Sequence, residues 1–289
     1  MSYRLKTILF QILALLPNKV DDFLYHKIQG FFDKSTLDNR LKSVEHTYLR
    51  LYNVLNQLNI DVKDKTVFEI GSGWFPGMPY FFKYKLQAKE VLTYDINKHF
   101  KKHTVLVLNR IFSIKYNCTI MPDSNNKFAL PSGIEYYPNY NILKQSFPSP
   151  DIVFSRYVLS HMRETDVISI HKKFKLQLKK GTYIIHFISP SDLRQHGDSS
   201  ISLQEFLQYS RSEWDKIHTK FDYHNRLRLP QFLEIFSDCG LEVVHLDYEG
   251  LKEGTRQYDL FKKVKFHPDY RKYSDEQLTA RNILVVLKV

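Results

Sequence analysis

Two glycines and a carboxylate lie together in this chain, at the end of a predicted strand. The stretch TVFEIGSGWFPGMPYFF, residues 66–82, reads as a strand that enters a glycine turn, with Glu69 just before Gly71 and Gly73. Such a turn lets backbone N–H groups approach a ligand closely. Pro76 stands where a dinucleotide-binding motif would have its third glycine, so a pyrophosphate cradle is not expected.

A second carboxylate, Asp95, ends the next predicted strand. An acidic side chain at that place can accept hydrogen bonds from both ribose hydroxyls of an adenosine. The carboxylate of Glu69 would repel a pyrophosphate but attract an ammonium group. The two residues together favour a ligand with an amino-acid tail at one end and an adenosine at the other, and S-adenosylmethionine has both.

Short apolar stretches that alternate with helical patterns must position these residues. The predicted strands cover 66–70, 90–96, 133–138, 151–156, 182–189, 241–248 and 282–289. Strands that alternate with helices predict an α/β fold, a mostly parallel sheet with helices on both faces. We expect a main domain over 61–289, with a helical lid insertion over about 191–236 that begins in a polar loop. The stretches 202–205, 210–213 and 274–277 resemble capping boxes, and Pro230 suits the first turn of a helix that ends at Gly240.

Residues 1–60 are predicted to be an N-terminal helical segment. The apolar run that ends at Pro17 is too short to cross a bilayer, which takes about 20 apolar residues. The residues after it offer no signal-peptide cleavage site. We therefore expect an amphipathic helix that docks on the domain or makes peripheral contact with a membrane.

The composition indicates which kinds of partner and which compartment to expect. A net charge of +11 favours anionic partners, although basic runs such as 97–103 and 172–180 are also typical of solvated helix faces. Cys118 and Cys239 match no disulfide or metal spacing. We therefore expect no metal site and a cytoplasmic protein, with peripheral attachment to the inner membrane as an alternative.

The motifs resemble those of a known family. FEIGSG, VLTYDI and DIVFSRYVLSHM (151–162) are similar to the motifs of class I S-adenosylmethionine-dependent methyltransferases. The likeness covers about 60–190, and the last two strands fit the ending of that family's seven-stranded Rossmann-like sheet. Ser160 stands where an acidic residue is common, which puts a metal role at that position in doubt. The segment 16–32 and the block from 192 to 244 resemble methyltransferases of bacterial exopolysaccharide and O-antigen clusters.

The resemblance implies S-adenosylmethionine as the cofactor and a set of residues around it. Glu69 would lie near the amino group, Asp95 would bind the ribose, and Ile96 would pack on the adenine. The residues implied to bind the cofactor are Glu69, Gly71, Ser72, Gly73, Asp95, Ile96, Ser155 and Arg156.

The acceptor is expected at the loops that follow the fourth and fifth strands, outside their carboxyl ends. Methyl transfer from a sulfonium needs alignment, and a hydroxyl acceptor also needs a base. The candidate catalytic residues are His161, Asp192 and His196. On a helix, Asp192 and His196 would share a face, so that the carboxylate could orient the imidazole. A helix-packing histidine and a solvated loop are the alternatives.

The stretch YHNRLRLP, residues 223–230, holds the candidate acceptor-binding residues His224, Asn225, Arg226 and Arg228. His224 is a further candidate base. Arginine side chains bind phosphate or carboxylate with two parallel hydrogen bonds, which predicts an anionic or glycan-type acceptor. The alternative is that these arginines pair with acidic residues of the protein itself.

We expect methyl transfer to a glycan, a sugar-phosphate or a related cell-surface precursor. A nucleic-acid or small-molecule methyltransferase is an alternative, as is a methyltransferase-like binding protein without activity. The chain has SRYV where base-amine methyltransferases carry NPPY or DPPY, so no stable nucleic-acid partner is expected. A nicotinamide-dependent oxidoreductase is opposed by Glu69 and Pro76. The sequence does not indicate an oligomeric state.

Overall fold

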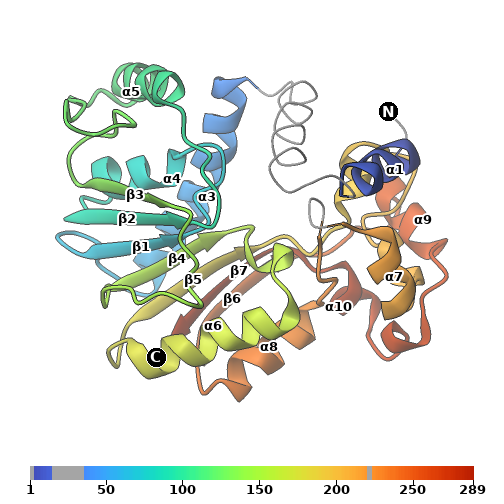
Figure 1. The fold of residues 1–289 in the computed structure, drawn as a ribbon. Helices are drawn as coiled ribbons and strands as arrows, with labels where there is room; N and C mark the ends of the chain where they lie inside the picture. The colour runs from blue at the N-terminus through green and yellow to red at the C-terminus, as the bar shows by residue number, and fades with distance from the viewer. Residues whose placement is uncertain (1–2, 15–35, 220–222) are drawn as a thin grey trace. The chain divides into compact units, whose positions relative to one another are not determined.

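The computed structural model of the chain describes residues 3–14, 36–219 and 223–289 (Figure 1). Its seven-stranded sheet has the order β3-β2-β1-β4-β5-β7-β6. The strands are β1 (Thr66–Ile70), β2 (Glu90–Asp95), β3 (Ile134–Pro138), β4 (Ile152–Arg156), β5 (Tyr183–Ile188), β6 (Glu242–Glu249) and β7 (Arg281–Lys288). The pairs β1–β2, β1–β4 and β2–β3 are parallel. The predicted Rossmann-like sheet is confirmed, with every strand within one residue of its expected bounds.

The central strands are almost continuously apolar because they are buried on both faces. In β1, for example, every residue from Val67 to Ile70 is buried. The parallel register places Glu69 beside Thr93 and Ile70 beside Tyr94. The carboxyl ends of β1 and β2 therefore lie next to each other, where the two predicted ligand-binding carboxylates stand.

The helices follow the expected sequence signals with one exception. They are α1 (Tyr3–Ala14), α3 (Leu37–Gln57), α4 (Gly77–Tyr80), α5 (Lys102–Tyr116), α6 (Glu164–Gln177), α7 (Arg211–Ile217), α8 (Leu229–Asp238), α9 (Arg256–Lys262) and α10 (Asp275–Thr279). The predicted capping boxes that begin at Ser210 and Ser274 open α7 and α10. The expected one at Ser202 opens only a 3-10 turn, Glu205–Gln208, because its hydroxyl accepts from the nearer backbone N–H of Gln204.

The chain divides into two compact units. Unit 1 comprises Met1–Lys34, Tyr157–His171 and Phe187–Val285, and unit 2 comprises Ser35–Arg156, Lys172–His186 and Val286–Val289. The predicted N-terminal segment is therefore divided, because α1 belongs to unit 1 and α3 to unit 2. Residues 16–32, which carried part of the resemblance, lie outside the described residues.

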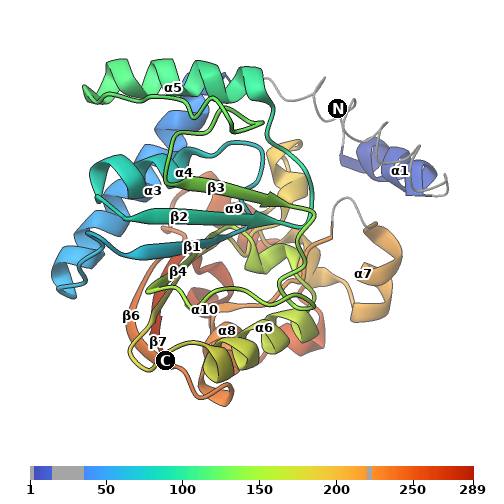
Figure 2. The ribbon, with the colours of Figure 1, turned by 60° about the vertical axis from the view of Figure 1, so that its left-hand side comes forward.

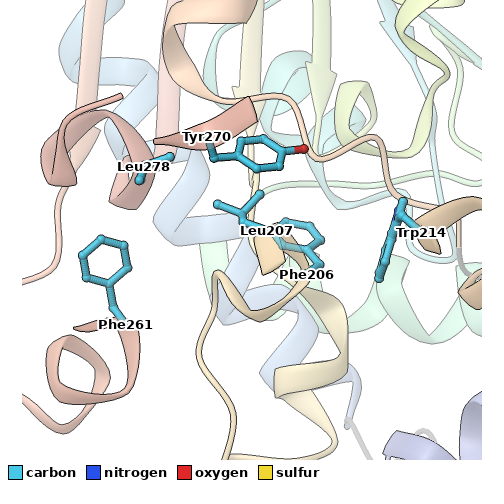
Figure 3. Close-up of a cluster of buried hydrophobic side chains, with 6 residues drawn as sticks. All are labelled: Phe206, Leu207, Trp214, Phe261, Tyr270 and Leu278. Carbon is cyan, nitrogen blue, oxygen red and sulfur yellow. The ribbon is translucent and has the colours of Figure 1, made fainter. Parts of the chain in front are cut away.

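The lid region belongs to unit 1 and has an apolar cluster of its own. Figure 3 shows the members of this cluster, Phe206, Leu207, Trp214, Phe261, Tyr270 and Leu278. They come from the 3-10 turn at 205–208 and from α7, α9, α10 and the segment between the last two. The lid region therefore packs on residues far along the chain rather than standing alone.

Helix α1 is attached to the same region of unit 1. Gln11 donates a hydrogen bond to the carbonyl of Lys216 at 3.1 Å, and Phe10 and Leu13 are buried. No helix of the described chain has both the length and the apolar character needed to cross a membrane. Cys118 and Cys239 are free, the first half-buried and the second buried.

Candidate active site

Glu69 is a buried carboxylate near the end of β1, in unit 2. Only 4% of it is exposed, and the hydroxyl of Thr93 on β2 donates to its Oε2. Burial raises the pKa of Glu69 to about 8, and the Thr93 hydrogen bond only partly opposes this shift. The negative charge of Asp95 raises the pKa further, while the positive charge of Arg156 lowers it. A cationic ligand at this carboxylate would relieve the desolvation of its charged form.

Asp95 is held at the end of β2 by the glycine turn that follows β1. The backbone N–H of Gly73 donates to its Oδ2 at 3.0 Å, and that of Asn97 donates to its Oδ1 at 2.8 Å. His99 Nε2 lies 3.6 Å from Oδ1. Burial raises the pKa of Asp95, and the two backbone hydrogen bonds and His99 oppose the rise. The turn and the carboxylate therefore form one fixed arrangement.

The two glycines are needed for the backbone of this turn. Gly71 has φ 73° and Gly73 has φ 60°, both in the left-handed region that side chains disfavour. The N–H of Gly71 donates to the carbonyl of Tyr94 at 2.8 Å, which fixes the turn to β2. A Cβ added at Gly73 would meet no atom within 4 Å, so the space beside the turn is open.

Other features around the turn fit S-adenosylmethionine. The hydroxyl of Ser72 is buried and has no hydrogen-bond partner among the described residues, so a polar ligand group would satisfy it. Ile96 is 65% exposed just beyond Asp95, where an adenine would find an apolar side chain. The Trp74 ring lies 4.7 Å from that of His99. Sequence reasoning did not select Trp74 or His99, although both stand within four residues of the motif residues.

Ser155 and Arg156, at the end of β4, have partners within unit 2. Ser155 is fully buried and its Oγ lies 2.7 Å from Nδ1 of His186 on β5. Its side chain therefore connects β4 and β5 and has no exposed surface for contact with a cofactor. Arg156 donates to the hydroxyls of Thr47 at 2.8 Å and Ser43 at 2.7 Å, both on α3. The helix thus orients the arginine whose charge influences Glu69.

In unit 1, Asn225 connects the loop before α8 to the turn after β4. Its backbone N–H donates to the carbonyl of Ser160 at 2.9 Å, and its side-chain amide donates to those of Leu159 and Met162 at 2.6 and 3.0 Å. Ser160 in turn donates to the carbonyl of Ser189, just after β5, at 2.8 Å. Asn225 therefore holds together the segments that follow two central strands.

Three predicted histidines gather in this part of unit 1. The ring of His224 lies 5.5 Å from that of His161. The positive charges that His161 and His196 carry when protonated lower the pKa of His224. Burial, reinforced by the neighbouring positive charges, holds the pKa of His224 well below its usual range. Neither of its ring nitrogens makes a hydrogen bond of normal geometry within the described chain. His161 Nδ1 lies 3.3 Å from the carbonyl of Tyr223.

Asp192 does not orient His196 in the way expected. The segment Leu193–His196 is a 3-10 helix, in which residues four apart do not share a face. The carboxylate of Asp192 is buried, caps this turn through the backbone N–H of Arg194, and pairs with the Arg194 guanidinium at 2.6 Å. Its hydrogen-bonding capacity is used within its own loop, so it is not available as a base or as the partner of one.

Arg226 and Arg228 do not form the expected anion pocket. Arg228 is 0% exposed and donates to three carbonyls, those of Arg226, Leu278 and Pro190. Arg226 is also buried and donates to the carbonyls of residues 206, 209 and 210. Burial lowers the pKa of Arg228 to about 10, and the carbonyl oxygens take the place of solvent. These guanidinium groups hold the lid region together.

No group of three or more His, Cys, Asp or Glu side chains is placed to hold a metal ion in the part of the chain that the structure describes.

Comparisons with known proteins bear on the fold. No family model matches the chain, and no curated protein sequence matches it. A solved structure of a candidate sarcosine dimethylglycine methyltransferase from Galdieria sulphuraria is similar with 12% identity and a TM-score of 0.50, over 84% of this chain and 85% of that one. Magnesium protoporphyrin IX methyltransferase from Synechocystis PCC 6803, solved with bound S-adenosylhomocysteine, has 10% identity and a TM-score of 0.49, over 93% of this chain and 94% of that one. The likeness to the Galdieria protein shows a shared fold, the Rossmann-like fold of class I methyltransferases.

Proposed function

We propose that this chain is an S-adenosylmethionine-dependent methyltransferase. The observation that carries the proposal is the pair of buried carboxylates at the ends of neighbouring parallel strands, with Asp95 fixed by the N–H of Gly73 and Glu69 without a full counter-charge. Such a pair suits a ligand with a cationic amine at one end and a diol at the other. The class I methyltransferase fold supports this reading, because ligands of open α/β sheets lie at the carboxyl ends of the strands.

Different residues of unit 2 would bind different parts of the cofactor. Glu69 would bind the amino group, the free hydroxyl of Ser72 would bind a polar group of the amino-acid end, Asp95 the ribose hydroxyls, and Ile96 the adenine. When bound, S-adenosylmethionine supplies an electrophilic methyl group on a sulfonium centre. Because the turn and Asp95 are already hydrogen-bonded to each other, little ordering is needed on binding.

For the acceptor, we propose a hydroxyl of a glycan, a sugar-phosphate or a related cell-surface precursor, which would place the chain in polysaccharide biosynthesis. A hydroxyl must lose a proton as it is methylated, whereas a carboxylate or phosphate need not. In unit 1 the guanidinium groups of the buried arginines Arg226 and Arg228 are used by backbone carbonyls, so they are not available to bind an anionic acceptor. A hydroxyl acceptor is therefore favoured over a purely anionic one.

The proposal is tested by thermal denaturation of the whole chain with S-adenosylhomocysteine, with S-adenosylmethionine, with NAD and without ligand. Binding to the folded state stabilises it by about 2.7 kcal/mol at a hundredfold excess over the dissociation constant. We expect the melting temperature to rise with the first two ligands and to stay unchanged with NAD. In Asp95→Ala we expect no rise with any of the ligands. A rise with NAD alone would refute the assignment. A methyl-donor assay with sugar-phosphates, lipid-linked sugars and RNA then identifies the class of acceptor.

A further inference from the structure

Helix α5, in unit 2, exposes large apolar side chains on its outer side. Leu106 and Val107 are each 43% exposed and Ile114 is 74% exposed, with Arg110 between them. Positions 106, 107, 110 and 114 follow the three- and four-residue spacing of one helix face. We call these four residues the α5 face. The opposite side of the helix is buried and consists of Val105, Leu108, Asn109 and Phe112.

The buried side of α5 packs against other residues of unit 2, whereas the α5 face is exposed. The Phe112 ring packs edge-on against Phe81 at 5.1 Å and lies 5.4 Å from the Tyr80 ring. Within unit 2, α5 lies beyond β3, at the outer edge of the sheet (Figures 1 and 2). Contiguous apolar side chains on a surface, rimmed by polar residues, mark interaction sites.

The segment that contains α5 has only basic charged residues. Residues 96–122 contain no Asp or Glu, and their basic residues are Lys98, Lys101, Lys102, Arg110 and Lys115. Lys115 is paired with Glu45 at 2.6 Å. Lys101, Lys102 and Arg110 are exposed, and within the described chain no ion pair involves them. The apolar row therefore has Arg110 within it and Lys101 and Lys102 at its N-terminal end, and the described chain leaves these three charges uncompensated.

We propose that the α5 face binds the surface of an anionic lipid bilayer. A helix with apolar side chains on its outer side and lysine or arginine at the border lies in the interface plane, with its apolar groups at the boundary of headgroups and acyl chains. Each basic residue near such a surface adds attraction to the lipid phosphates. This surface is distinct from α1, and the proposal does not depend on methyl transfer.

The same observations disfavour the other occupants. A nucleic acid would use the positive charges, but it would leave Leu106 and Ile114 without apolar contacts. A second copy of the chain, docked face to face, would bring the same uncompensated lysines and arginine against each other. Only the bilayer surface complements both the apolar row and its charged border.

The test is co-sedimentation of the full chain with vesicles of phosphatidylcholine alone and of phosphatidylcholine with one-third phosphatidylglycerol. We expect binding to the anionic vesicles that weakens with added salt, and no binding to the neutral ones. The triple variant Lys101→Gln, Lys102→Gln, Arg110→Gln should lose affinity by a factor on the order of 100, since each charge contributes roughly fivefold. The double variant Leu106→Ser, Ile114→Ser should lose at least about tenfold.

Two matched controls separate this surface from others. Lys172→Gln, Lys175→Gln, Lys179→Gln removes the same charge from and just beyond α6, and Leu176→Ser, Val243→Ser removes two exposed apolar side chains from α6 and β6. Both controls should bind anionic vesicles within about threefold of the unchanged chain. All substituted side chains are solvent-exposed, so the melting temperatures of all variants should agree, which circular dichroism checks.

The proposal is overturned if the chain does not bind anionic vesicles, if the α5 variants bind them as well as the unchanged chain, or if either control loses as much. It is also overturned if the α5 variants lose binding to polyuridylate RNA, or lose self-association in sedimentation equilibrium, while vesicle binding is unchanged.

Discussion

The raised pKa of Glu69 makes the effect of Glu69→Gln depend on pH in a defined way. A carboxyl group with a pKa of about 8 in the folded chain and 4.5 in the unfolded chain binds more protons when folded, between those two values. The free energy of unfolding therefore falls as pH rises through that window and levels off above it. At 1.36 kcal/mol per unit, the loss reaches roughly 4 kcal/mol at pH 8. Glutamine cannot ionise, so the variant should escape this loss.

Ligand binding should show the opposite dependence. Only the ionised carboxylate attracts an ammonium group, and below its pKa the ionised fraction rises about tenfold per pH unit. The dissociation constant of S-adenosylhomocysteine should therefore fall roughly tenfold from pH 6 to pH 7 in the unchanged chain. In Glu69→Gln the binding should be weak, and its dissociation constant should not depend on pH.

Urea unfolding without ligand, at about pH 5 and pH 8, measures the first effect, and isothermal titration calorimetry with S-adenosylhomocysteine measures the second. The reasoning is refuted if Glu69→Gln shows the same loss of unfolding free energy between the two pH values as the unchanged chain. A dissociation constant that does not change with pH in the unchanged chain would refute it equally.

Three further predictions concern other residues. Arg228→Met should lower the free energy of unfolding by at least about 3 kcal/mol, because three buried carbonyls lose their donor, while the folded fraction keeps its affinity for S-adenosylhomocysteine; unfolding and calorimetry together check this. Burial lowers the pKa of His171 to about 4, so between pH 6.5 and pH 4 the unfolded chain binds a proton at this residue that the folded chain does not. Roughly 3 kcal/mol of unfolding free energy should therefore be lost as pH falls through that window. Urea unfolding should show no such loss in His171→Phe, which cannot bind the proton. Ile96→Ser should weaken S-adenosylhomocysteine binding about tenfold without changing the melting temperature, because the side chain is exposed; equal affinity would exclude contact with the adenine.

The sheet and the cofactor motif could be predicted because their signals are local. An apolar run such as 66–70 between turn residues is sufficient to indicate a buried strand, and a glycine pair after it indicates the turn. The parallel register then brings the ends of adjacent strands together, so Glu69 and Asp95 follow from their strand positions. The lid helices α7 and α8 were also indicated by their capping residues and by Pro230.

The hydrogen-bond partners of the long polar side chains could not be predicted, because they lie in distant parts of the chain. Arg228 reaches the carbonyls of Pro190 and Leu278, and Arg156 reaches hydroxyls on α3 more than a hundred residues away. A sequence shows that an arginine is charged, not which carbonyls surround it. Asp192 was misjudged for a different reason, since the spacing of four residues implied a shared face only for an α-helix and the segment is a 3-10 turn.

The central claim, that Glu69 and Asp95 bind opposite ends of one S-adenosylmethionine molecule, is tested most directly by a crystal structure of the chain with S-adenosylhomocysteine. We predict the amino group of the ligand within hydrogen-bonding distance of Glu69 and both ribose hydroxyls within that distance of Asp95. A ligand bound away from either carboxylate, or bound with its ends exchanged, would contradict the claim.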